Sequence, residues 1–126
     1  MRGKGKGIFR MSPQFSVASH FADKEPATRK IYDRLLKASG KFGPVIEDPK
    51  KTSIHLVNKT AFAGIATRKS AIILTIKSDQ KLASPRIHKF EQTSARRFHH
   101  EVKLTSAADV DAELTGWLKA AYELSG

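Results

Sequence analysis

The sequence predicts a single α+β domain, with a mostly antiparallel sheet of four to five strands packed by an N-terminal and a C-terminal helix. A chain of 126 residues has the usual length of one compact domain. Apolar residues recur at helical spacing near both ends of the chain and alternate at strand spacing between them. Short connections in the middle of the chain favour antiparallel neighbours.

The first residues differ in character from the rest. Met1 to Gly7 contains three glycines and three cations and nothing that could be buried. We therefore expect a basic, disordered tail over residues 1–19 and a folded domain over residues 20–126. No apolar segment typical of a secretory signal follows, and no stretch is long enough to span a bilayer. These features favour a cytoplasmic domain with no membrane partner.

The first helix is expected from about residue 26 to residue 42. Asp23 is a candidate cap, and Pro26 would lie in the first turn, where its missing N–H costs nothing. Gly40 and the pair Gly43-Pro44 should end the helix. Its apolar stripe consists of Ala27, Ile31, Leu35, Ala38 and Phe42.

The middle of the chain reads as an antiparallel meander of three strands, over residues 52–57, 61–66 and 71–77. Residues 52–57 alternate in polarity, and 58–59 and 68–69 are plausible tight turns. The third strand is apolar on both sides, which predicts that both of its faces are covered at least in part.

The last third contains one further strand and the second helix. Residues 78–97 suggest a loop or short helix, and residues 98–104 a strand with Phe98, His100, Val102 and Leu104 inward. Ser106 and Asp109 form a capping box ahead of the C-terminal helix. The apolar face of that helix comprises Val110, Leu114, Trp117, Leu118, Ala121 and Tyr122.

Six short segments occur in the order of a known family. They are YDRLL (32–36), GPV (43–45), KTSI (51–54), FAGI (62–65), HEVKL (100–104) and WLKAAY (117–122). Together they resemble the bacterial family known as domain of unknown function 5655, over roughly residues 20–124. The resemblance supports the fold and implies no activity and no catalytic residues.

The formal charge of +11 is concentrated in the middle of the chain. Residues 49–103 hold twelve Lys or Arg and three acidic residues, whereas the C-terminal residues 104–126 are net acidic. A basic segment of this kind attracts polyanions, although a solvated surface would have the same composition. We therefore predict an anion-binding module, with nucleic acid as the leading partner. The candidate anion-binding residues are Lys51, Lys59, Arg68, Lys69, Arg86, His88, Arg96, Arg97, His99 and Lys103.

Two alternatives belong to other classes of function. The small residues of the strand around Ala63 and Gly64 could leave room for a protein partner or a small ligand, in a pocket lined by Ile54, Phe62 and His100. The third functional hypothesis is a metal-dependent nuclease, because Glu101-Val102-Lys103 has the acid-x-Lys spacing of such enzymes.

Few features of the sequence indicate catalysis or a cofactor. The nuclease interpretation needs a second acid, for which Asp79 is the candidate. Five histidines without any cysteine do not make a zinc motif, and His99 with Glu101 is the best pair of ligands on one strand face. We expect no metal site, no cofactor and no catalytic residues beyond the weak candidates Glu101 and Lys103.

Overall fold

A computed structural model describes residues 15–126 of the chain, so most of the predicted 1–19 tail lies outside the described residues. The elements in order are η2 (Ala18–Phe21), α1 (Pro26–Gly40), β1 (Ile46–Pro49), β2 (Ile54–Val57), β3 (Ala61–Thr67), β4 (Ile72–Ser78), β5 (Ile87–Ser94), β6 (Arg97–Leu104), η3 (Ala107–Asp109) and α2 (Ala112–Leu124). The predicted α+β class is confirmed.

The described strands form one antiparallel sheet of six, in the order β1-β2-β3-β4-β6-β5. The predicted meander is present as β2, β3 and β4, and the predicted strand 98–104 is β6. β6 pairs with β4 over seven residue pairs, and β5 folds back onto the outer side of β6. The sheet therefore has one or two more strands than the sequence predicts.

The two additional strands are the edges of the sheet. β1 has four residues, includes Pro49 and is at most half-buried, so it lacks a strand pattern. β5 is exposed along nearly its whole length, with only Ile87 half-buried. The prediction of a loop or short helix over 78–97 is wrong for 87–94, because an edge strand with two solvated sides needs no apolar alternation.

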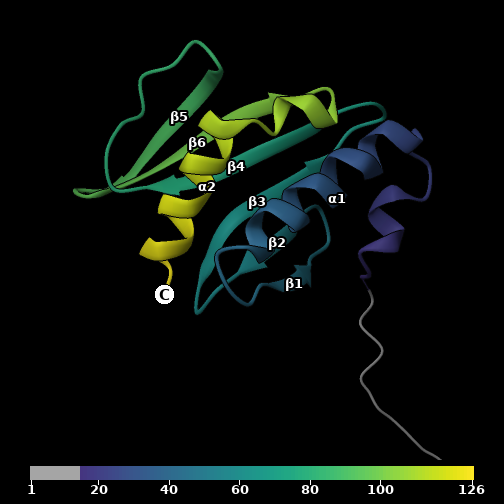
Figure 1. The fold of residues 1–126 in the computed structure, drawn as a ribbon, viewed down its shortest axis with the longest axis horizontal. Helices are drawn as coiled ribbons and strands as arrows, with labels where there is room; N and C mark the ends of the chain where they lie inside the picture. The colour runs from purple at the N-terminus through teal and green to yellow at the C-terminus, as the bar shows by residue number, and fades with distance from the viewer. Residues whose placement is uncertain (1–14) are drawn as a thin grey trace, which may run out of the picture.

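Both α-helices pack on the same face of the sheet, which we call the helix face (Figure 1). Alternate residues of the central strands point toward them, so that β4 buries Ile72, Leu74 and Ile76 completely. In between, Ile73, Thr75 and Lys77 are only half-buried on the opposite face, the open face. The third strand of the meander is thus fully covered on one side and partly covered on the other.

The N-terminus of α1 differs from its prediction. Pro26 is the first helical residue, but the N-cap is Glu25, and the Asp23 carboxylate pairs with Lys24 at 2.7 Å. Contacts with the β3–β4 turn position the helix instead. The Glu25 N–H and the Thr28 hydroxyl donate to the Lys69 carbonyl at 2.8 and 2.9 Å.

The predicted capping box lies one turn ahead of α2. The Asp109 carboxylate accepts a hydrogen bond from the Ser106 N–H at 3.2 Å, which stabilises η3. The N-cap of α2 is Asp111, whose side chain accepts from the Leu114 N–H at 3.0 Å. The predicted apolar face of α2 is buried as expected, with Trp117 partly buried at its margin.

Candidate anion-binding surface

The register of the sheet determines which side chains share the open face. His55 is opposite Gly64, Gly64 is opposite Thr75, and Thr75 is opposite Glu101. Two residues further along β4, Lys77 is opposite His99. Side chains directly opposite each other in an antiparallel pair lie on the same face, so both rows are on the open face.

A shallow depression of about 300 Å³ lies on this face above β3, and we call it the Gly64 hollow. Small residues of β3 make its floor, because Gly64 and its neighbours leave space between the longer side chains of β2 and β4. Its lining consists of Ser53, His55, Ala61, Phe62, Ala63, Gly64, Ala66, Thr75, Lys77 and His99. No carboxylate is among these lining residues.

Lys77 is the cation best placed at this hollow. Its ammonium donates to the Thr60 hydroxyl at 3.2 Å, and within residues 15–126 it has no carboxylate within ion-pair distance. Burial and the nearby Arg97 guanidinium lower the pKa of Lys77. Two cations held close together without a counter-charge favour the binding of an anion between them.

Arg97 and His99 continue this side of the open face along β6. Both side chains are half-buried, and they alternate with the inward-facing Phe98. Carboxylates of the open face lie around this group. Asp48 of β1 is opposite His55, and Glu91 of β5 is opposite His99. Glu101 of β6 is opposite Thr75 and contacts His88 at 3.4 Å. The cations beside the hollow therefore come from the end of β4 and the start of β6.

Three of the predicted residues gather at the opposite end of the sheet. Arg68, Lys69 and Lys103 line a depression of about 620 Å³ beside the β3–β4 turn. Glu25 also lines it, so its charge is mixed. We call this the Arg68 end of the sheet, and the end with Lys77 and Arg97 the Arg97 end.

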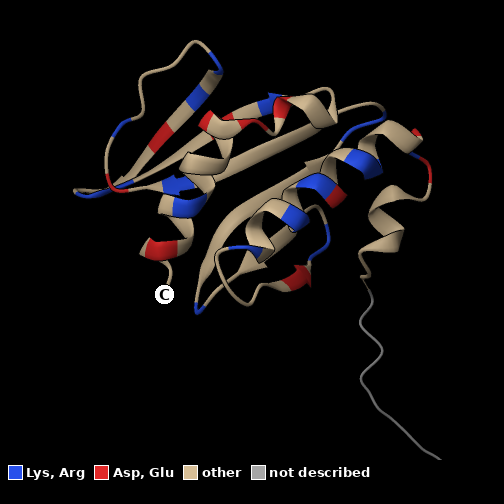
Figure 2. Cartoon of the chain, in the orientation of Figure 1, with Lys and Arg blue, Asp and Glu red and all other residues tan. Residues whose placement is uncertain are grey.

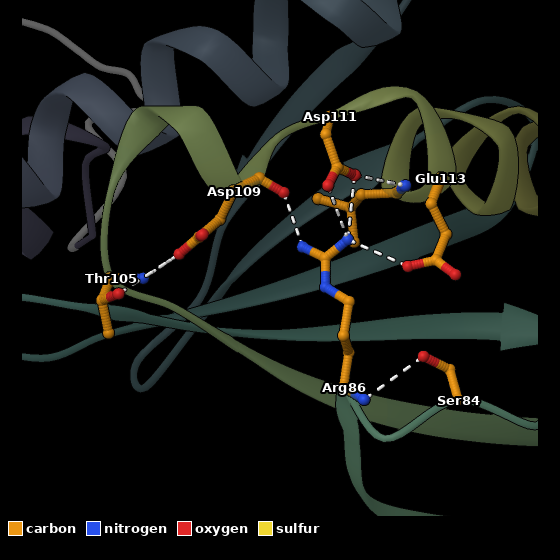
Figure 3. A network of polar contacts seen from close by, with 7 residues as sticks. Ser84, Arg86, Thr105, Asp109, Asp111 and Glu113 are labelled. Atoms are coloured by element: carbon orange, nitrogen blue, oxygen red, sulfur yellow. Dashed lines mark hydrogen bonds and ion pairs between the residues drawn. The ribbon is translucent and has the colours of Figure 1, made fainter.

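Arg86 has a structural role in the fold (Figure 3). Its guanidinium contacts Asp111 at 2.8 Å and Glu113 at 3.2 Å, and it donates to the Asp109 carbonyl at 2.7 Å. The same group lies 5.9 Å from the centre of the Trp117 ring. Two carboxylates already balance this cation, so Arg86 contributes little free charge to the surface.

The remaining predicted residues are in exposed connections. Lys51 lies between β1 and β2, Lys59 in the β2–β3 turn and Arg96 in the β5–β6 turn. Figure 2 shows Lys and Arg at both ends of the sheet and along α1. The structure thus places Arg68, Lys69 and Lys103 at one end of the strands and Arg97 and His99 at the other. Arg86 is in ion pairs, and the His88 ring lies 3.4 Å from the Glu101 carboxylate.

The nuclease candidates do not form a site with Asp79. Glu101 and Lys103 share the open face, as their spacing predicts. Asp79, however, follows β4 four residues beyond Thr75, the partner of Glu101, which separates the two acids by about 13 Å at the usual strand rise. Within residues 15–126 no three His, Asp or Glu side chains are arranged to hold a metal ion.

The pocket predicted from Ile54, Phe62 and His100 is not present in that form. Ile54 and His100 are fully buried on the helix face, and only Phe62, at a β-bulge, borders the Gly64 hollow. Neighbouring residues of a strand point to opposite faces of the sheet, so Ile54 and His100 lie on the other side from the hollow. Ala63 and Gly64 do leave a depression, as predicted, but its walls are Lys77, His99 and His55.

A third depression lies on the helix side, between α2 and the segment after β4. It measures about 520 Å³ and is lined in part by Trp117, Leu82 and Leu124. Asp79 and Glu123 also border it. Lys77 lines this recess as well, next to the two acids, so the recess has mixed charge and favours an anion less than the Gly64 hollow does.

Lys77 is absent from the sequence-based candidates, although the alternation of β4 identifies its face. Ile72, Leu74 and Ile76 point inward, which places Lys77 outward with Thr75. The sequence does not show that β4 pairs with β6, because the segment between them, residues 79–96, contains another strand. That pairing brings Lys77 next to His99 and Arg97.

One known protein family matches most of the chain. The sequence model of a domain of unknown function (DUF5655) matches residues 17–125. The chain belongs to the DUF5655 family. No curated protein and no solved structure shows significant similarity to it. Membership of DUF5655 brings no activity with it, and none of the described helices is long and apolar enough to cross a membrane.

Proposed function

We propose that this chain is a non-catalytic anion-binding module that binds nucleic acid through the open face of its sheet. The observation that carries the proposal is the pair Lys77 and Arg97 beside the Gly64 hollow. Both are partly buried, they repel each other, and no carboxylate lines the hollow. A phosphate between them would replace this repulsion with two attractive contacts.

The distribution of the other cations favours a polyanion as the ligand. Lys103 is opposite Ile73, which is four residues or about 13 Å from Lys77 along β4 at the usual strand rise, and Arg68 lies further along at the Arg68 end of the sheet. A single small anion cannot contact both groups. A nucleic-acid strand with regularly spaced phosphates can do so, and this spacing supports nucleic acid over an isolated anion.

The proposal is tested by fluorescence anisotropy with labelled 12-nucleotide DNA and RNA at about 50 mM salt. We expect binding by the wild type and a loss of at least about 10-fold in the double variant Lys77→Ala/Arg97→Ala. The matched control is Lys37→Ala/Lys41→Ala, which removes the same charge from α1 and the residue after it, on the helix side of the sheet.

Two results would contradict the proposal. One is the absence of binding by the wild type at low salt. The other is an equal loss in both double variants, which would assign the binding to net charge alone and not to the open face.

A further inference from the structure

Gly64 is an unusual residue for its position. It lies in the middle of a central strand and does not have the positive φ that favours glycine. A Cβ atom at this position would meet only ordinary contacts, with Thr75 at 3.8 Å and His55 at 4.0 Å. Glycine weakens a strand relative to residues with side chains, and it often marks a place where a ligand approaches the backbone closely.

The walls of the Gly64 hollow differ in chemistry from one side to the other. On the β4–β6 side are Lys77 and its strand partner His99, and Arg97 lies just outside the lining, two residues before His99 on the same face of β6. On the β2 side are the His55 ring and Ser53, and the Thr75 hydroxyl lies between the two sides. A ligand that matches both sides has a charged group at one end and a flat, hydrogen-bonding body at the other.

We infer that the Gly64 hollow receives a phosphomonoester attached to a nucleoside, with the phosphate at Lys77, Arg97 and His99 and the nucleoside over Gly64 toward His55. This inference rests on the proposed function and deepens it. The two sources of such a group are a free mononucleotide and the phosphorylated end of a nucleic-acid strand.

The number of cations supports a monoester over the diester backbone. A monoester carries a charge of about −1.5 to −2 at pH 7, whereas each backbone phosphate carries about −1. Lys77 and Arg97 supply two charges that no described carboxylate balances at the hollow. A dianionic group neutralises both of them at one point.

The size of the hollow supports a body no larger than one nucleoside. Its volume of about 300 Å³ lies at the lower end of the range for small-molecule sites. The His55 ring beside Gly64 offers an aromatic face or edge to a base. Without a side chain at position 64, a ring can rest directly on the strand backbone.

The experiment compares 12-nucleotide single strands of one sequence with a 5′-phosphate, with a 3′-phosphate and with no terminal phosphate. We expect one phosphorylated form to bind at least about 10-fold more tightly than the unphosphorylated strand. Adenosine monophosphate and inorganic phosphate are added as competitors. Competition by the mononucleotide would identify the free nucleotide as a ligand, and its absence would restrict the site to strand ends; either result supports the shared chemistry.

The matching variant is Gly64→Val, which fills the hollow with a residue that favours strands. We expect a folded protein with a midpoint of thermal unfolding no lower than that of the wild type. It should lose the preference for a terminal phosphate, so that strands with and without that group bind with similar affinity. Gly116→Ala is the control, because position 116 is on α2 with open space around it.

The outcomes separate this inference from the proposed function. If all three strands bind equally and Gly64→Val changes nothing, the inference is overturned and the proposed function stands. If no strand binds to the wild type, both fail. If a terminal phosphate is preferred equally by wild type and Gly64→Val, the hollow is not the site and the inference is overturned.

Discussion

Gly43 is the one described glycine at which the backbone requires the absence of a side chain. Its φ is +147°, and a Cβ there would lie 2.5 Å from the Tyr122 hydroxyl. That hydroxyl donates to the Pro44 carbonyl at 2.9 Å and ties α2 to the segment after α1. We predict that Gly43→Ala lowers the free energy of unfolding by about 1–3 kcal/mol, through backbone strain and displacement of Tyr122.

Gly116 provides the opposite case for the same substitution. It lies within α2, is exposed, and a Cβ added to it would have no neighbouring atom within 4 Å. Gly116→Ala should raise the free energy of unfolding by about 0.5–1 kcal/mol, because alanine loses less backbone entropy in a helix. Urea unfolding of both variants measures the effects. An equal effect of the two substitutions would contradict the role assigned to Gly43.

His100 is a buried histidine whose protonation the fold opposes. Its Nε2 accepts a hydrogen bond from the Leu82 N–H at 2.9 Å, so the ring is neutral with the proton on Nδ1. Nδ1 has no well-formed hydrogen bond within the described residues, although the Ile76 backbone favours the charged form. Burial, followed by the nearby His99 and Lys81, lowers the pKa of His100 below its usual value.

This depressed pKa makes stability depend on pH. The unfolded chain binds a proton at this residue near pH 6.5, whereas the folded chain resists it. Stability from His100 is therefore present above about pH 6.5 and is lost as the pH falls toward the folded-state pKa. We predict that the free energy of unfolding in urea falls between about pH 7.5 and 5.5, and that it falls less in His100→Gln. An unchanged pH dependence in the variant would contradict this prediction.

At the scale of elements, Arg86 fastens the start of β5 to the N-terminal turn of α2 (Figure 3). The Leu114 N–H and then Arg86 lower the pKa of Asp111, so the same carboxylate caps the helix and binds the guanidinium. We predict that Arg86→Ala lowers the free energy of unfolding by about 1–2 kcal/mol. Arg86→Lys should recover only part of the lost free energy of unfolding, because an ammonium cannot make all the contacts of the planar guanidinium with the two carboxylates and the Asp109 carbonyl.

The measurement is urea unfolding, with Lys89→Ala as the control on the exposed part of β5. The control should change the free energy of unfolding by less than about 0.5 kcal/mol. Arg86→Ala should also leave nucleic-acid affinity nearly unchanged, because two carboxylates already neutralise its charge. A large loss of binding without a loss of stability would place Arg86 in the binding surface.

The elements that sequence patterns predict best are those with one buried side. β2, β3, β4, β6 and both helices have such a side, and their apolar spacing follows directly from it. β1 and β5 are exposed edges, which leave no such pattern. The cap of α1 is also beyond sequence patterns, because Thr28 and Glu25 bond to the backbone of a turn about forty residues away.

In the candidate site, too, the sequence predicts which face a strand residue occupies but not which residues of other strands lie beside it. The alternation predicted for residues 98–104 correctly separates His99, Glu101 and Lys103 from the buried His100, Val102 and Leu104. The partner of each strand is a property of the whole fold, so the meeting of Lys77 with Arg97 requires the structure. For the same reason the sequence could not show that Arg86 would meet the acidic start of α2.

Considered as a whole, the molecule carries Lys77 and Arg97 toward one end of the sheet and Arg68 and Lys103 toward the other, and Figure 2 shows Lys and Arg at both ends. A ligand must be long enough to contact both groups if both contribute to affinity. In B-form geometry each strand rises about 3.4 Å per nucleotide, so three nucleotides span about 10 Å and twelve span about 40 Å. The contribution of the Arg68 end should therefore depend on the length of the strand.

This dependence gives a prediction for the salt titration of binding. For a 12-nucleotide strand, Arg68→Ala/Lys103→Ala and Lys77→Ala/Arg97→Ala should each reduce the slope of log K against log salt by about 1.4, from two lost phosphate contacts at about 0.7 each. For a three-nucleotide strand, measured by competition, only Lys77→Ala/Arg97→Ala should weaken binding. If the Arg68 end affects both lengths equally, the two groups belong to separate sites, and a strand does not bridge the open face.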